Sequence, residues 1–162
     1  MALLFMRYSA FLLPCLLLAG AACQRVTEGT SSTSVSTPIT PDAPLRETRW
    51  VLRQVGGQPI GEVASPSQQP YLFISAAGTA EGQGGCNRFR GALKPATDDA
   101  ELQFAPLQST RMACPELVTE QAFAQALEST HAYRITGKLL LLYADAERTG
   151  TPLAQLEAVP LP

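Results

Sequence analysis

Histidine and a surplus of basic residues are what this sequence has least of, and each scarcity excludes a class of function. The 162 residues include one histidine, 12 Lys and Arg, and 14 Asp and Glu, for a net charge of -2. Proteins that bind nucleic acid carry a basic excess, so we expect no nucleic-acid partner. A serine triad would have to use His131. Its position at the end of a predicted helix favours a role in capping that helix.

Motifs for a cofactor or a metal are also missing. Glycines cluster at 82–85, but the cluster leads into a strand pattern and not into a helix. It is therefore neither a phosphate loop nor a dinucleotide fingerprint. Two distant cysteines and one histidine cannot close a four-ligand zinc site. We predict no catalytic residues, no metal and no cofactor, and a protein that is not an enzyme.

Long hydrophobic runs are scarce, and the clearest one lies at the N-terminus. Residues 11–18 are apolar, Arg7 precedes them, and the small residues 19–22 follow. This order is typical of an export signal, and the run is too short to span a bilayer. We predict a signal peptide at 1–22. Because the positive region should come first, we expect translation to start at Met6.

Cys23 follows the small residues, as the cysteine of a bacterial lipobox does. The match is incomplete, since Gly20 stands where such a box usually carries leucine. We expect lipid on Cys23; the alternative is cleavage after Ala21 or Ala22, which leaves a free thiol. A lipid would tether the protein to a membrane. By resemblance to lipoprotein sorting signals, Gln24 favours the outer membrane of a bacterial cell envelope, with the protein facing the periplasm.

A low-complexity segment separates this N-terminus from the folded part. Residues 23–45 are rich in Ser, Thr and Pro and have no apolar period. They cannot bury enough surface to offset the entropy of ordering, so we predict a lipid anchor and a disordered tether there. The remainder, 46–160, is long enough for one domain with one core.

The predicted domain combines strands with a single helix. Short alternating runs between the many Gly and Pro residues indicate six to eight strands. One helix is expected within 115–130, where Pro115 suits the first helical position. Its buried side should carry four apolar residues: Leu117, Phe123, Ala124 and Leu127. The fold class is therefore α+β, with a small, mainly antiparallel, barrel-like sheet and one main helix.

Two cysteines, Cys86 and Cys114, lie within the predicted domain. Cys15 leaves with the signal and Cys23 is assigned to the lipid, so an even pair remains in an oxidising compartment. We expect a structural disulfide between them, closing a loop of about 29 residues and stabilising by roughly 3–4 kcal/mol. Two reduced, buried thiols are an alternative. A redox-active pair is another, although the short spacing that lowers thiol pKa is missing.

Polar residues flank both cysteines: Asn87, Arg88, Thr110 and Arg111. If the cysteines are bridged, these side chains converge. One interpretation is a small site that binds an anion or a peptide. The other is structural: Thr110 caps a turn, Asn87 tolerates an unusual backbone angle, and the arginines are solvated or paired with Glu116 or Glu120.

Two motifs surround the cysteines. The first runs from Gly84 through Cys86-Asn87-Arg88-Phe89 to Gly91, and the second is Thr110-Arg111-Met112-Ala113-Cys114-Pro115. Together they resemble the HslJ-like META domain family. Trp50 and Leu52 in the opening strand also fit. The usual aromatic after Gly91 is replaced by Ala92-Leu93. The resemblance covers roughly residues 46–159.

This resemblance implies a compact α+β domain, often in an envelope lipoprotein linked with stress or antibiotic tolerance. It implies no catalytic residues. We therefore expect a monomeric, non-enzymatic interaction or stress-accessory protein with an envelope protein as partner. The alternative is a barrel that binds a small ligand or lipid. An open apolar pocket among Trp50, Phe73, Phe89 and Phe104 would favour the ligand binder, and a filled core would favour the interaction protein.

Overall fold

The computed structural model describes residues 41–61, 63, 65–113 and 115–161. The predicted signal peptide at 1–22, the lipid on Cys23 and most of the tether lie outside the described residues. Within the described part, no helix combines the length and the apolar character needed to cross a bilayer.

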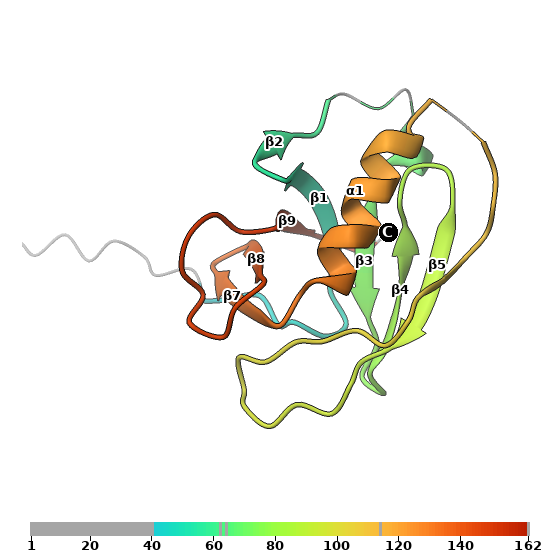
Figure 1. Cartoon of the computed structure of the whole chain (residues 1–162). Helices are drawn as coiled ribbons and strands as arrows, with labels where there is room; N and C mark the ends of the chain where they lie inside the picture. The colour runs from blue at the N-terminus through green and yellow to red at the C-terminus, as the bar shows by residue number, and fades with distance from the viewer. Residues whose placement is uncertain (1–40, 62, 64, 114, 162) are drawn as a thin grey trace, which may run out of the picture. The chain divides into compact units, whose positions relative to one another are not determined.

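The described chain forms nine strands, one α-helix and one short 3-10 helix (Figure 1). In chain order these are β1 Arg49–Val55, β2 Gln58–Pro59, η1 Pro66–Gln68, β3 Tyr71–Ile74, β4 Thr79–Gln83, β5 Arg88–Ala92, β6 Gln108–Ser109, α1 Leu117–Glu128, β7 Ala132–Thr136, β8 Leu139–Tyr143 and β9 Ala154–Val159. The predicted α+β class, with a mainly antiparallel sheet and one main helix, is confirmed.

All nine strands belong to one antiparallel sheet. Its order is β6-β5-β4-β3-β1-β9-β8-β7, and β2 pairs with the end of β1. The sheet is not closed by pairing of its end strands. The segment between β5 and β6 instead links the two ends, because Phe104 forms an isolated bridge to Leu93 and Glu101 forms one to Ala132. The sheet predicted as barrel-like is therefore an open, curved sheet, and a loop joins its two ends.

Helix α1 begins at Leu117, two residues after Pro115, and packs one side against the sheet (Figure 1). Phe123, Ala126 and Leu127 are its buried residues, at the three- and four-residue spacing of one helix face. Leu117 and Ala124 are only half-buried. They border a pocket described below.

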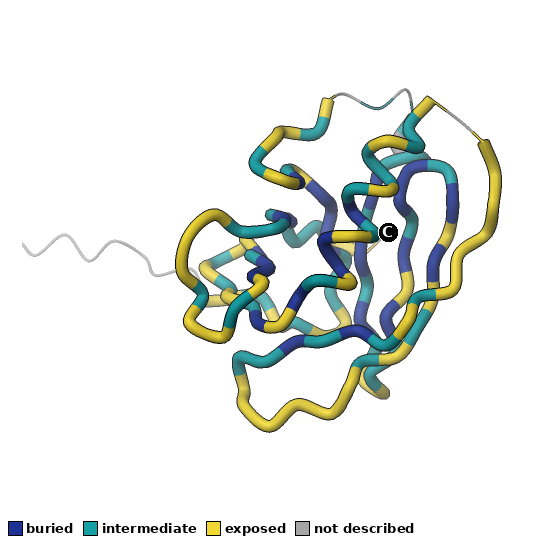
Figure 2. The backbone as a smooth tube through the Cα atoms, in the orientation of Figure 1, coloured by how far each residue is buried: buried dark blue, intermediate teal, exposed yellow. Residues whose placement is uncertain are grey.

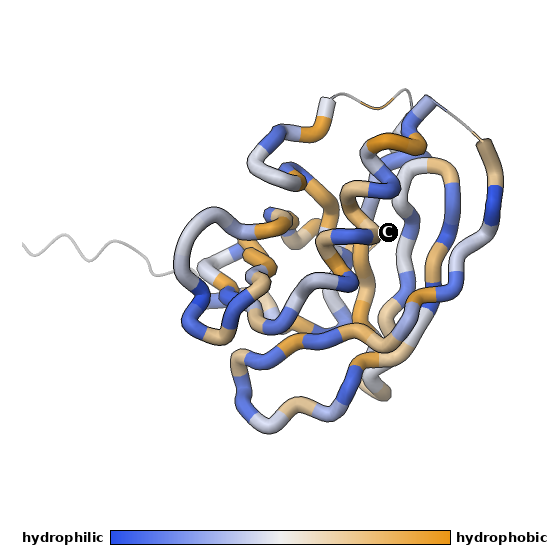
Figure 3. Tube along the Cα trace, viewed as in Figure 1, coloured by the Kyte–Doolittle hydropathy of each residue, from blue (hydrophilic) through white to orange (hydrophobic). Residues whose placement is uncertain are grey.

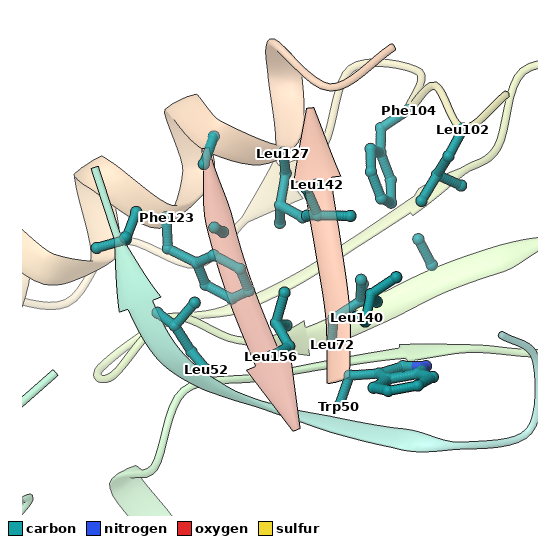
Figure 4. Close-up of a cluster of buried hydrophobic side chains, with 14 of the residues drawn as sticks. Trp50, Leu52, Leu72, Leu102, Phe104, Phe123, Leu127, Leu140, Leu142 and Leu156 are labelled. Carbon is teal, nitrogen blue, oxygen red and sulfur yellow. The ribbon is translucent and has the colours of Figure 1, made fainter. Parts of the chain in front are cut away.

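The core lies between α1 and the inner face of the sheet (Figure 4). Trp50, Phe123 and Leu127 are fully buried in it. The indole Nε1 of Trp50 donates a hydrogen bond of 2.9 Å to the carbonyl oxygen of Leu45, so its buried polar atom is satisfied. Leu45 and Ala43 pack against this core, so contacts with the domain begin just before the predicted boundary at residue 46.

Candidate functional site

The turn that holds Cys86 is attached to α1 through the carboxylate of Glu120. Glu120 Oε2 accepts hydrogen bonds from the backbone N–H groups of Cys86 at 3.1 Å and Asn87 at 2.7 Å. Glu120 lies in the first turn of α1, where negative charge is favourable. A charged acceptor shared by two amides is a strong contact. The helix therefore determines the shape of the turn.

Asn87 connects this turn to the second motif. Its side chain is 2% exposed. Asn87 Oδ1 accepts from Thr110 Oγ1 at 2.9 Å and from Met112 N at 2.7 Å. Asn87 Nδ2 donates to the Met112 carbonyl at 3.0 Å and to Glu120 Oε1 at 2.6 Å. Both ends of the amide are thus occupied within the protein. We call Asn87, Glu120, Thr110 and Met112 the clasp.

Two glycines allow the turn to approach α1. A Cβ atom on Gly84 would lie 2.3 Å from Glu120 Cγ, closer than real Cβ contacts. Gly85 has a φ of +141° and faces Glu116, where a Cβ would lie 3.1 Å from Glu116 Cβ. The glycines that precede Cys86 therefore serve close packing against the helix.

The four residues predicted as a binding site divide into two pairs. Asn87 and Thr110 belong to the clasp and use their polar atoms internally. Arg88 and Arg111 are exposed. The structural interpretation proposed an unusual backbone angle at Asn87. That detail is wrong, since the non-glycine residues with positive φ in the described part are Glu47 and Arg148.

Cys114 lies outside the described residues, so the Cys86–Cys114 bridge stays a prediction. The residue whose role sequence reasoning missed is Glu120. From the sequence, it is interpreted only as a partner for an arginine. The sequence shows that Glu120 closely follows the second motif. It does not show the partners of Glu120, which lie more than 30 positions earlier in the chain.

An apolar pocket of about 480 Å³ opens next to the clasp, between α1 and the segment 107–113. Its apolar lining comes from both sides: Phe89, Leu107, Met112, Leu117, Phe123 and Ala124. Phe89 and Phe123 meet edge to face there, with ring centroids 5.9 Å apart. Arg111, Glu120 and Glu128 add charge to the lining. Such a pocket can accept apolar side chains, with polar contacts supplied by charged residues and backbone.

A second concavity of about 810 Å³ lies beside the loop that joins the sheet ends. Hydrogen bonds from Thr97, first from its backbone and then from its hydroxyl, lower the pKa of Glu101. Burial, and then the charge of Asp99, raise the pKa of Tyr133. Tyr133 donates its hydroxyl hydrogen to the Asp99 carbonyl. These polar groups hold the loop in place.

In the described ranges, no three or more His, Cys, Asp or Glu residues lie together so that they could hold a metal ion. His131 Nδ1 lies 3.1 Å from the Ser129 carbonyl oxygen, at the end of α1. This contact suits the capping role expected from its position.

The model of the META domain family matches residues 43–159 of this chain. An NMR structure of a protein has 24% identity to it, covers 70% of this chain and 90% of its own, and has a TM-score of 0.53. An NMR structure of a protein from Burkholderia xenovorans has 28% identity to this chain, covers 71% of this chain and 83% of its own, and has a TM-score of 0.50. A crystal structure of a DUF4847 family protein from Bacteroides vulgatus has 14% identity, covers 70% and 92%, and has a TM-score of 0.46. No curated protein matches the chain.

Proposed function

The chain belongs to the META domain family, and on that premise we propose that it is a non-enzymatic, lipid-anchored protein of the bacterial cell envelope that binds a partner protein. The observation that carries the binding role is the apolar pocket beside the clasp. Asn87 and Thr110 are committed to internal hydrogen bonds, whereas Met112 is 61% exposed at the pocket. What is left for a ligand at the pocket is mainly apolar surface, with Arg111 and Glu128 in its lining. Aromatic residues, Met and Arg are enriched in protein interfaces.

The filled interior favours this role over that of a barrel that binds a small ligand. Trp50 and Phe104 are 0% and 5% exposed and belong to the packed core. Phe89 is also in that core and lines the pocket, but Trp50 and Phe104 do not line it. We further propose that the bound partner links the protein to envelope stress or tolerance, and family membership is the support for that role.

A photoreactive benzophenone residue in place of Met112 tests the binding role. In intact cells, we expect irradiation to give a discrete adduct of higher mass with a partner protein. Leu139 is 43% exposed in β8 and provides the matched control at an exposed apolar position elsewhere. No adduct is expected there. An absent adduct at Met112, or equal adducts at both positions, would contradict the proposal.

The lipid anchor predicts a clear change in fractionation. Cys23→Ser removes the thiol that would carry the lipid, so the protein should move from the membrane fraction to the soluble fraction of the envelope. The measurement is immunoblotting of both fractions for the wild type and the variant. Cys15→Ser is the control, because that cysteine lies in the predicted signal and should not affect membrane retention. Retention of the Cys23 variant would remove the lipoprotein claim.

A further inference from the structure

We propose that the partner enters as an extended, acidic segment that adds a strand to the free edge of β6 and places an apolar side chain in the pocket. This inference rests on the proposed function, since it names the occupant of the same pocket. It depends on four observations: the backbone at the edge, the contrast with the other edge, the position of the pocket and the charges around the edge.

The backbone of Ser109 faces away from the sheet. β6 pairs with β5 in the register Phe89↔Ser109 and Arg90↔Gln108. Thr110 N donates to the Arg88 carbonyl at 3.1 Å. In an antiparallel ladder, hydrogen-bonded pairs alternate with pairs whose N–H and C=O groups point outward. The N–H and C=O of Ser109 therefore point outward, to where an added strand would lie.

The two edges of the sheet differ in how they are covered. At the β7 edge, Tyr133 N donates to the Ala100 carbonyl, and the bridge between Glu101 and Ala132 lies beside it. At the β6 edge, residues 108–113 are exposed along their length (Figure 2). Exposed edges are the usual sites for strand addition, and main-chain hydrogen bonds then supply affinity.

The pocket lies on one face of the sheet, beside β6. A strand added at β6 would extend that face. Ser109 is the cross-strand neighbour of Phe89, and both line the pocket. Because successive side chains on a strand alternate between faces, every second side chain of an added strand would point toward α1 and the pocket. The pocket can then select an apolar residue at that position.

Arginines surround the same edge. Arg88, Arg90 and Arg111 are exposed, and the ion pair found in the described part joins Arg53 to Glu157 instead. Segment 108–111 is hydrophilic (Figure 3). In the sequence, the apolar residues Met112 and Ala113 follow it. Arg88 and Arg90 alternate with the buried Phe89 and so lie on the face away from the pocket, whereas Arg111 is in the pocket lining. Acidic side chains on the outward face of the added strand would complement Arg88 and Arg90, which favours an acidic segment over a basic one.

The test is a titration of the full-length protein, in detergent micelles, with three fluorescein-labelled ten-residue peptides. The first alternates valine with glutamate, the second has lysine in place of glutamate, and the third is the first with alternate amides N-methylated. Measured by fluorescence anisotropy, the first should bind at least about tenfold more tightly than the other two, because it alone has both the charge and the free amides.

Two variants at one position locate the binding edge. Ser109→Pro removes the outward N–H but leaves the inward bonds of its neighbours, and proline is tolerated at an edge. It should weaken binding of the first peptide by at least about tenfold, whereas Ser109→Ala should not change it. Equal binding of the lysine or N-methylated peptide, no binding of any peptide, or full affinity in Ser109→Pro would each overturn the proposal. Adducts at Met112 would still form if only this inference fails, and would be lost if the proposed function fails.

Discussion

Asn87→Ala is expected to lower the free energy of unfolding by about 3 kcal/mol, because it leaves polar groups of the clasp without partners. The lost contacts include the hydrogen bond to Glu120 Oε1 at 2.6 Å and the pair of bonds to the Met112 backbone. The residue is 2% exposed, so water cannot fully replace them. Trp50 is the single tryptophan and is fully buried, so its fluorescence can follow urea unfolding.

Two matched variants show whether loss of the clasp causes the lower free energy of unfolding. Thr110→Val removes two hydrogen bonds, the one donated to Asn87 Oδ1 and the one accepted from Arg88 N at 3.3 Å. Because Thr110 is exposed, water can replace them, and the change should cost only about 1 kcal/mol. Asn87→Asp keeps an acceptor for Met112 N but places a second carboxylate against Glu120. It should destabilise at least as much as Asn87→Ala, because like charges at this distance repel. If Asn87→Ala is no worse than Thr110→Val, the clasp does not hold the motifs together.

Gly82→Ala is expected to cost about 3 kcal/mol, at the upper end for overpacking of a well-packed site. Gly82 is buried in β4 between its partners Leu72 and Phe89. A Cβ atom there would lie 2.1 Å from the Tyr71 carbonyl oxygen and 2.6 Å from Phe89 Cζ. Because one of these atoms belongs to the backbone of the neighbouring strand, a change of side-chain rotamer cannot relieve the conflict.

Gly61→Ala is the control for this substitution. A Cβ atom at Gly61 would meet nothing within 4 Å, so its effect should stay within about 0.5 kcal/mol. The measurement is again urea unfolding, supported by circular dichroism to show that the variants fold. Equal stability of Gly82→Ala and Gly61→Ala would mean that the close approach of Tyr71 and Phe89 to Gly82 is not required for folding.

Local patterns in the sequence predicted the elements well. The apolar spacing around Phe123 and Leu127 predicted α1, and short alternating runs between Gly and Pro residues predicted strands such as β5. These signals depend on periodicity within a few residues, which the chain carries wherever it folds. The same reasoning placed Ala124 on the buried side of the helix and left Ala126 out. A short helix alone does not reveal how far its buried face extends.

The candidate site was harder to predict. The sequence drew attention to Asn87 and Thr110 as residues that could bind a ligand, and the structure shows them bonded within the clasp. Asn87 and Glu120 are 33 positions apart, and no periodicity connects them. A polar side chain near a glycine-rich turn looks the same in a sequence whether it serves a ligand or the fold.

The glycine-rich stretch before Cys86 shows the difference between what the sequence predicts and what only the tertiary structure reveals. By itself the sequence determined the fold class, the resemblance to the META domain family and the expectation that this stretch and the Thr110–Pro115 motif belong together. The fold class follows from local spacing and composition, whereas the resemblance rests on the residues of the two motifs. Only the tertiary structure decided that Glu120 binds the amides of the turn and that Asn87 is buried. It also decided that an apolar pocket and the edge of β6 lie beside them. The reason is physical: hydrogen-bond partners and exposed edges are relations between distant segments, and folding creates them.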